Sequence, residues 1–136
     1  MTMDANGSAS TKRFVGNAAA SLAEIDKVQQ SLRFRLPKSY VEFMLSRNGG
    51  EGLVGRSYLV LWKIEELVAM NDAYHVAEFA PGLFLLGTDG GGEAFGFDTR
   101  SDACRIVSVP FVEMEIENAE VVAPDFGAFF STLSNS

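Results

Sequence analysis

The side chains best suited to nucleophilic or acid–base chemistry in this 136-residue sequence are a single histidine, His75, and a single cysteine, Cys104. A catalytic thiolate needs a base, and a serine triad would have to use His75. The sequence contains no G-x-S-x-G element, and one histidine with one distant cysteine does not form the usual zinc site. We interpret Cys104 as a small buried side chain and His75 as the end of a helix. We therefore predict a protein that is not an enzyme and has no cofactor and no metal site.

The glycine-rich stretch TDGGGEAF at residues 88–95 has the composition of a phosphate-binding loop. Such a loop needs a following helix N-terminus and often a lysine, whereas this stretch is flanked by Asp89 and Glu93 and followed by a strand pattern. The two carboxylates would repel a phosphate, and they lack the spacing of a calcium-binding EF-hand loop. The pattern favours the turn of a β-hairpin. A small-molecule cleft near Asp89, Glu93 and His75 is an open but less favoured hypothesis.

A row of acidic residues is the most informative surface feature. The stretch FVEMEIE at residues 111–117 alternates apolar and acidic side chains, which predicts a strand with Glu113, Glu115 and Glu117 on its wet face. Glu120 lies just beyond. Carboxylates spaced about 6–7 Å apart lie inside the Debye length of about 8 Å and repel one another weakly. The row is either a solvated sheet face that blocks edge pairing or a patch that docks a basic protein. We expect Asp102 to be a weaker member of such a patch.

The net charge of −7 is unevenly distributed along the chain. Residues 1–68 carry nine basic and seven acidic side chains, whereas residues 69–136 carry two basic and eleven acidic ones. An acidic half repels nucleic acid and anionic lipid and attracts basic partners. The sequence contains no apolar stretch of signal-peptide or membrane-span length and no pair of cysteines for an internal disulfide. We therefore expect a cytoplasmic protein with a protein partner, and with neither a nucleic-acid nor a membrane partner.

The elements that position these residues follow from periodicity. Helical spacing predicts helices over residues 22–33, 37–47, 64–74 and 124–133, the first with a capping box at Ser21 and Glu24. Strand patterns cover residues 58–62, 83–87, 94–98, 105–109 and 111–117. Residues 1–18 are expected to be a flexible tail, and residues 19–136 one domain. The fold class is α+β, a mainly antiparallel sheet of about five or six strands with an N-terminal helix pair, one inserted helix and a C-terminal helix.

The separated stretches LPKSYVEFMLSRNGG, WKIEEL, GTDGGGEAFGFD and PDFGAFFSTL occur in this order over residues 20–134. This arrangement resembles the SUKH superfamily, specifically its Smi/Knr-type branch. The positions that carry the resemblance are Leu36, Pro37, Tyr40, Phe43, Asn48, Gly49, Gly50, Gly87, Asp89 and Gly92. We interpret them as determinants of the fold.

The resemblance implies a binding function. Bacterial members are commonly immunity proteins that neutralise toxins, frequently nucleases, and a fungal relative is a scaffold-like regulator of cell-wall synthesis. A nuclease toxin must bind polyanions and is often basic, which agrees with the acidic charge of this chain. We therefore expect an immunity protein that neutralises a basic toxin domain through Glu113, Glu115, Glu117, Glu120 and Asp102. The alternative is a regulatory or scaffold module with an endogenous partner.

Overall fold

The computed structural model describes residues 12–135, and within them seven antiparallel strands form one sheet whose order follows the chain. The strands are β1 (Val15–Gly16), β2 (Gly50–Val54), β3 (Ser57–Leu61), β4 (Leu83–Thr88), β5 (Glu93–Asp98), β6 (Arg105–Pro110) and β7 (Glu120–Ala123). The helices are α1 (Leu22–Gln30), α2 (Lys38–Ser46), α3 (Leu67–Ala73), α4 (Val76–Phe79) and α5 (Phe129–Ser134), with short 3-10 turns η2 (Ile64–Glu66), η3 (Ile116–Asn118) and η4 (Phe126–Ala128). The predicted α+β class is confirmed, with more strands than expected.

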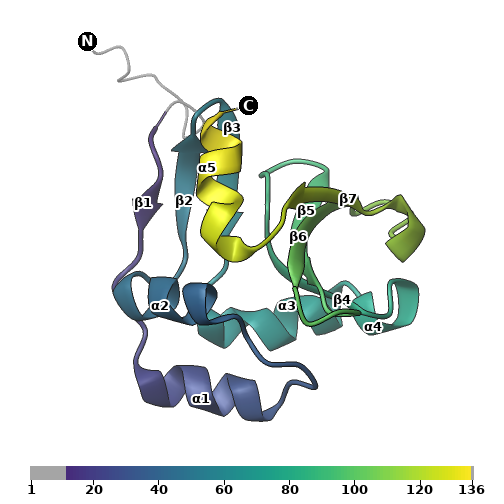
Figure 1. The fold of residues 1–136 in the computed structure, drawn as a ribbon, viewed down its shortest axis with the longest axis horizontal. Helices are drawn as coiled ribbons and strands as arrows, with labels where there is room; N and C mark the ends of the chain where they lie inside the picture. Colours follow the sequence, from purple (N-terminus) through teal and green to yellow (C-terminus); the bar gives the residue numbers. More distant parts are fainter. Residues whose placement is uncertain (1–11, 136) are drawn as a thin grey trace.

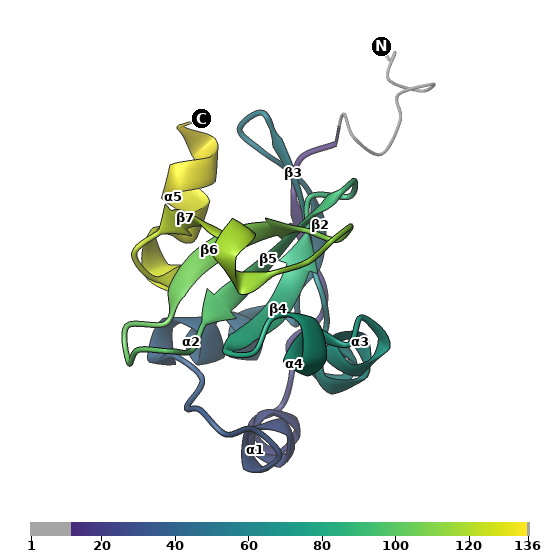
Figure 2. The same ribbon diagram turned by 90° about the vertical axis from the view of Figure 1, so that its right-hand side faces the viewer.

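The helices surround the sheet from several sides. Figure 1 shows α5 in front of β2 and β3, and α1 at the far end of the molecule beyond α2. Helices α3 and α4 pack against β4, and β4 to β7 form the curved half of the sheet in Figure 2. Within residues 12–135, no helix is long and apolar enough to cross a membrane.

The helix boundaries follow local signals in the sequence. The predicted capping box is present, since Ser21 Oγ accepts from the Glu24 N–H at 3.1 Å and Glu24 Oε1 accepts from the Ser21 N–H at 2.9 Å. Helix α2 begins directly after Pro37, and the chain leaves it through Gly49 at φ +75°. The region expected as one helix over 64–74 is divided into η2 and α3.

The core is covered on both faces of the central strands. The neighbouring residues Ala94 and Phe95 of β5 point to opposite faces of the sheet, and both are buried. On one face the ring of Tyr40 packs edge-on against Phe97 at 5.3 Å and Phe126 at 5.1 Å. The Tyr40 hydroxyl is buried without a hydrogen-bond partner, and this burial raises its pKa. Aromatic packing rather than hydrogen bonding therefore holds Tyr40 in place.

The side chains of two buried asparagines, Asn48 and Asn71, hydrogen-bond to backbone groups that have no neighbouring strand on that side. Asn48 Oδ1 accepts from the Ile64 N–H at 2.7 Å, and Asn48 Nδ2 donates to Glu65 Oε1 at 2.8 Å. Asn71 Oδ1 accepts from the Leu85 N–H at 2.8 Å, and its Nδ2 donates to the Leu85 carbonyl at 2.9 Å. Each amide thus satisfies buried polar groups that have no strand beside them.

The first two strands were missed in the sequence. Gly50 and Gly52 have φ of +158° and +145°, and a Cβ at either would collide with the backbone of residues 13–16. Glycine here allows close approach of β1 to β2, where sequence reasoning treats it as a loop residue. Part of the expected tail over 1–18 is therefore strand, with Val15 paired to Glu51. Residues 1–11 of that tail lie outside the described residues.

The predicted strand over 111–117 is wrong. Strand β6 ends at Pro110, opposite Glu93, the first residue of β5. One further hydrogen bond joins the Phe111 N–H to the Gly92 carbonyl at 2.9 Å. After it, the pairing of β6 with β5 ends, because β5 does not extend further. The chain instead turns through Glu113 at φ +57°, forms η3 and resumes as β7.

Replacing Asn48 by alanine is expected to lower the free energy of unfolding by about 2–3 kcal/mol, because the buried Ile64 N–H then has no acceptor. Urea denaturation followed by circular dichroism measures this change. The exposed Gln30→Ala in α1 is the control, with an expected change within about 0.5 kcal/mol. Equal effects of the two substitutions would contradict the role given to Asn48.

Candidate functional site

The predicted row of glutamates does not exist as a row. Glu113 lies in the turn after β6, Glu115 precedes η3, Glu117 lies within η3, and Glu120 begins β7. The alternation that predicted a common face is lost, because these residues do not share a strand. The residues must therefore be placed one by one.

Two of the predicted residues, Glu113 and Glu115, line one groove with Glu78 of α4. The groove has a volume of about 570 Å³. Its walls combine three carboxylates with three aromatic rings, and we call it the acidic groove; these residues are Glu78, Glu113, Glu115, Tyr74, Phe79 and Phe111. Sequence reasoning missed Glu78, Phe79 and Phe111, because residues distant in sequence meet here only through the fold.

The aromatic wall of the acidic groove is continuous with the core. Tyr74 stacks on the buried Trp62 with centroids 6.4 Å apart and an interplanar angle of 10°, and it contacts Phe111 at 4.6 Å. Phe79 is 52% exposed, and Val112 beside the groove is 77% exposed. Exposed apolar side chains beside carboxylates suit a lysine or arginine side chain, which gains ion pairing and cation–π attraction together.

The backbone is constrained on both sides of the groove. Glu113 has φ +57°, and His75, which joins α3 to α4, has φ +54°. A non-glycine residue in this region costs about 1–2 kcal/mol, so the surrounding packing must hold it there. The His75 ring packs edge-on against Phe79 at 6.1 Å, and Asn118 Nδ2 donates to the Glu113 carbonyl at 3.4 Å. The groove is therefore built from fixed turns.

The other predicted acids lie in different surroundings. Glu117 is close enough to Arg100 to help raise the pKa of its guanidinium, although the hydrogen bonds to Asp98 are the larger cause. Glu120 lies near Glu93, whose pKa is raised by burial and then by the Asp89 and Glu120 carboxylates. Asp102 lines a separate groove together with three basic residues. The structure thus brings together only two members of the predicted patch.

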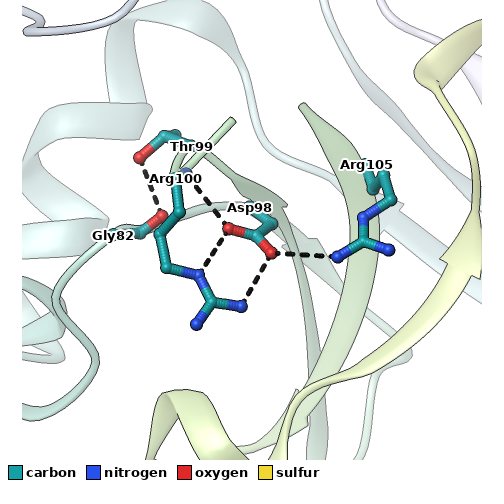
Figure 3. Close-up of polar contacts among 5 residues, drawn as sticks. All are labelled: Gly82, Asp98, Thr99, Arg100 and Arg105. Carbon is teal, nitrogen blue, oxygen red and sulfur yellow. Dashed lines mark hydrogen bonds and ion pairs between the residues drawn. The ribbon is translucent and has the colours of Figure 1, made fainter. Parts of the chain in front are cut away.

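Asp98 is the most strongly perturbed carboxylate, and it is 5% exposed. Figure 3 shows Arg100 binding it through two side-chain hydrogen bonds of 2.9 Å, with Arg105 on the other side at 3.6 Å. The side-chain hydrogen bonds from Arg100 are the main reason that the pKa of Asp98 falls to about 2. Thr99 Oγ1 donates to the Gly82 carbonyl at 2.7 Å, so this cluster joins the start of β4 to the end of β5. Its role is structural.

The glycine-rich turn is held by hydrogen bonds among its own residues. Asp89 Oδ1 accepts from the N–H groups of Gly91 at 2.8 Å and Glu93 at 3.2 Å, and β4 and β5 form the predicted hairpin. Asp89 is thereby used as a turn residue. Among residues 12–135, no group of three or more His, Cys, Asp or Glu side chains is arranged to hold a metal ion.

The positions that carry the family resemblance lie in the core and in turns. Leu36 and Tyr40 are buried, Phe43 packs against Phe126 at 5.5 Å, and Pro37 precedes α2. The remaining positions follow α2 or lie in the β4–β5 hairpin; they are Asn48, Gly49, Gly50, Gly87, Asp89 and Gly92. None of the ten lines the acidic groove.

The left-handed conformation of Glu113 predicts an unusual response to glycine. Glu113→Gly is expected to leave the free energy of unfolding unchanged or to raise it by up to about 1 kcal/mol, because the backbone strain is relieved. Glu115, at φ −143°, provides the matched control, and Glu115→Gly is expected to lower stability by about 0.5–1 kcal/mol. Urea denaturation of both variants gives the comparison, and equal destabilisation would exclude strain at Glu113.

The depressed pKa of Asp98 predicts a pH dependence of stability. The folded-state pKa of about 2 lies below the ordinary 3.8, so the stabilisation is fully present above about pH 4–5 and is lost as the pH falls towards 2. At pH 6 the free energy of unfolding of the wild type should be about 1–2 kcal/mol higher than that of Asp98→Asn, a value that allows for the solvent exposure of Arg100. The difference should shrink towards pH 2 in urea denaturation series. A difference independent of pH would show that the carboxylate charge is not the cause.

Comparison with known proteins identifies the family. The family model of the SMI1 / KNR4 family (SUKH-1) matches residues 19–132, from the segment before α1 into α5. A search of curated proteins finds no match to the chain. The match covers most of the sequence and agrees with the resemblance inferred from its separated stretches. The chain therefore belongs to the SMI1 / KNR4 family (SUKH-1).

Proposed function

We propose that this chain is a non-catalytic, cytoplasmic protein-binding domain that neutralises a basic toxin domain, which makes it an immunity protein. The observation that carries the proposal is the acidic groove, where Glu78, Glu113 and Glu115 stand beside exposed aromatic rings. The proposed contact surface is therefore centred on this groove. Glu117, Glu120 and Asp102, which were expected in the same patch, belong to its surroundings at most.

The chemistry of the groove supports a basic protein as the partner. The ion pairs among residues 12–135 are those of Asp98 with Arg100 and Arg105, so within this range the groove carboxylates form no ion pair. A partner's lysine or arginine would supply that cation and pack its aliphatic stem on Phe79. The net charge of −7 would accelerate association with a basic surface. A typical interface of about 800 Å² per partner would extend well beyond the groove.

The family and the reactive side chains support binding rather than catalysis. The chain belongs to the SMI1 / KNR4 family (SUKH-1), and the ten positions interpreted as fold determinants lie outside the groove. The Cys104 thiol is buried, and burial raises its pKa, which is the opposite of an activated nucleophile. His75 packs against Phe79. These contacts suit a scaffold for a binding surface.

The test is binding and protection with the toxin domain encoded beside this chain. The double variant Glu113→Lys/Glu115→Lys is expected to weaken the complex at least about tenfold in calorimetry and to abolish protection in co-expression. The double variant Asp26→Lys/Glu42→Lys makes the same charge change on the exposed faces of α1 and α2, and it should weaken binding less than about threefold.

The outcomes separate the alternatives. Equal weakening by the two double variants would contradict the acidic groove as the contact surface. Binding to host proteins without protection from any toxin would favour the regulatory or scaffold alternative. Turnover of a substrate that disappears in His75→Ala, with the fold intact, would overturn the non-catalytic role.

A further inference from the structure

A second groove lies between the connection of α1 to α2 and the turn from β5 to β6. It has a volume of about 580 Å³. Its walls carry two cations of the α1–α2 connection, one cation at the start of α2 and three polar residues of the turn, and we call it the basic groove; these residues are Arg33, Arg35, Lys38, Thr99, Ser101 and Asp102. The two chain segments lie on the same side of the molecule in Figure 2. The acidic and basic grooves share no lining residue.

The three cations of the basic groove have no partner among the described residues. Arg33, Arg35 and Lys38 are exposed, and none of their side chains forms an ion pair or a hydrogen bond with residues 12–135. Of the described residues that line the groove, Asp102 carries the one carboxylate. Three unpaired cations in one hollow are unexpected on a protein of net charge −7, because acids elsewhere are plentiful. The groove therefore presents a localised positive surface.

The segment that carries the arginines is held rigidly. The side chain of Gln29 binds it on two sides, donating to the Phe34 carbonyl at 2.8 Å and accepting from the Leu36 N–H at 2.8 Å. The Phe34 ring packs against Phe84 at 5.3 Å, and Leu36 is buried in the core. Arg33 and Arg35 are exposed on either side of the half-buried Phe34. Their backbone is fixed before any ligand binds, which lowers the entropic cost of binding.

The basic groove continues into a longer hollow. A neighbouring groove of about 590 Å³ shares Arg33, Phe34 and Thr99 with it and passes between α3 and the start of β4. Apolar side chains, including Val68 and Phe84, line this continuation together with Asn71 and Asp72, so the acidic residues of a ligand belong at the arginines and not here. Each hollow has a volume larger than a small anion requires. Together the two hollows suit an extended polypeptide that places carboxylates on the arginines and apolar side chains in the continuation.

We propose that the basic groove binds an acidic segment of a partner protein in an extended conformation, independently of the acidic groove. Arginine pairs with carboxylates through two parallel hydrogen bonds, and Arg33 and Arg35 are both free to do so. Nucleic acid is disfavoured, because the continuation is lined by apolar side chains such as Val68 and Phe84, which suit the apolar side chains of a polypeptide better than a sugar–phosphate backbone. The partner is thus a protein with an acidic segment, separate from the basic partner of the proposed function.

The test uses a fluorescein-labelled peptide of about twelve residues, half of them Glu or Asp, long enough to span both hollows. Fluorescence anisotropy with the full chain should show saturable binding that weakens with salt. The double variant Arg33→Glu/Arg35→Glu should weaken binding at least about tenfold. The double variant Lys27→Glu/Arg56→Glu makes the same charge change at exposed positions outside both hollows, and it should weaken binding less than about threefold.

Further arms decide the nature of the ligand and the independence of the site. A peptide with Gln and Asn in place of the acids should not bind, and inorganic phosphate or a single-stranded oligonucleotide of equal charge should compete poorly. The groove variant Glu113→Lys/Glu115→Lys should bind the acidic peptide at least as well as wild type, so failure of the toxin experiment leaves this result unaffected. Equal loss in both arginine and control variants, preference for the oligonucleotide, or no binding at low salt in a folded protein would overturn the proposal.

Discussion

The side chain of Asn48 hydrogen-bonds to Ile64 and Glu65, the first two residues of η2, and its backbone carbonyl accepts from Asn17 Nδ2 at 2.9 Å. These contacts fix where the chain leaves β3 and enters η2. Helix α3 continues from η2 without a break, so the entry point also sets the position of Tyr74 and, through α4, of Glu78. One wall of the acidic groove is therefore positioned by a buried amide that does not line it.

The opposite wall depends on where the sheet ends. Strand β5 begins at Glu93, so β6 has no partner beyond Pro110 and the chain must turn away. The turn passes through Glu113 in a left-handed conformation, and the Phe111 ring rests on Tyr74 of the first wall. The two walls thus contact each other through aromatic packing and do not need a ligand to come together. A preformed groove of this kind binds with a smaller entropic loss than a flexible acidic tail would.

Local signals in the sequence were enough to predict the elements whose boundaries are set by neighbouring residues. The capping box at Ser21 and the hairpin around Asp89 are both present. Features set by distant backbone could not be predicted in the same way. Alternation over 111–117 is a necessary property of a half-exposed strand, but a strand also needs a partner, and the end of β5 removes it. Gly52 gave a misleading signal, because it allows the close approach of Arg13 and Phe14, directly before β1, and does not mark a loop.

The distribution of charge in space follows from a small number of ion pairs. The acidic half of the sequence contains two basic residues, Arg100 and Arg105, and both bind the nearly buried Asp98. Asp98 holds them because a buried carboxylate without cations would be costly, whereas Glu113 and Glu115 remain hydrated when unpaired. Arg100 and Arg105 therefore neutralise Asp98 and do not neutralise the groove carboxylates. The groove is acidic because its lining within residues 12–135 carries three carboxylates and no lysine or arginine.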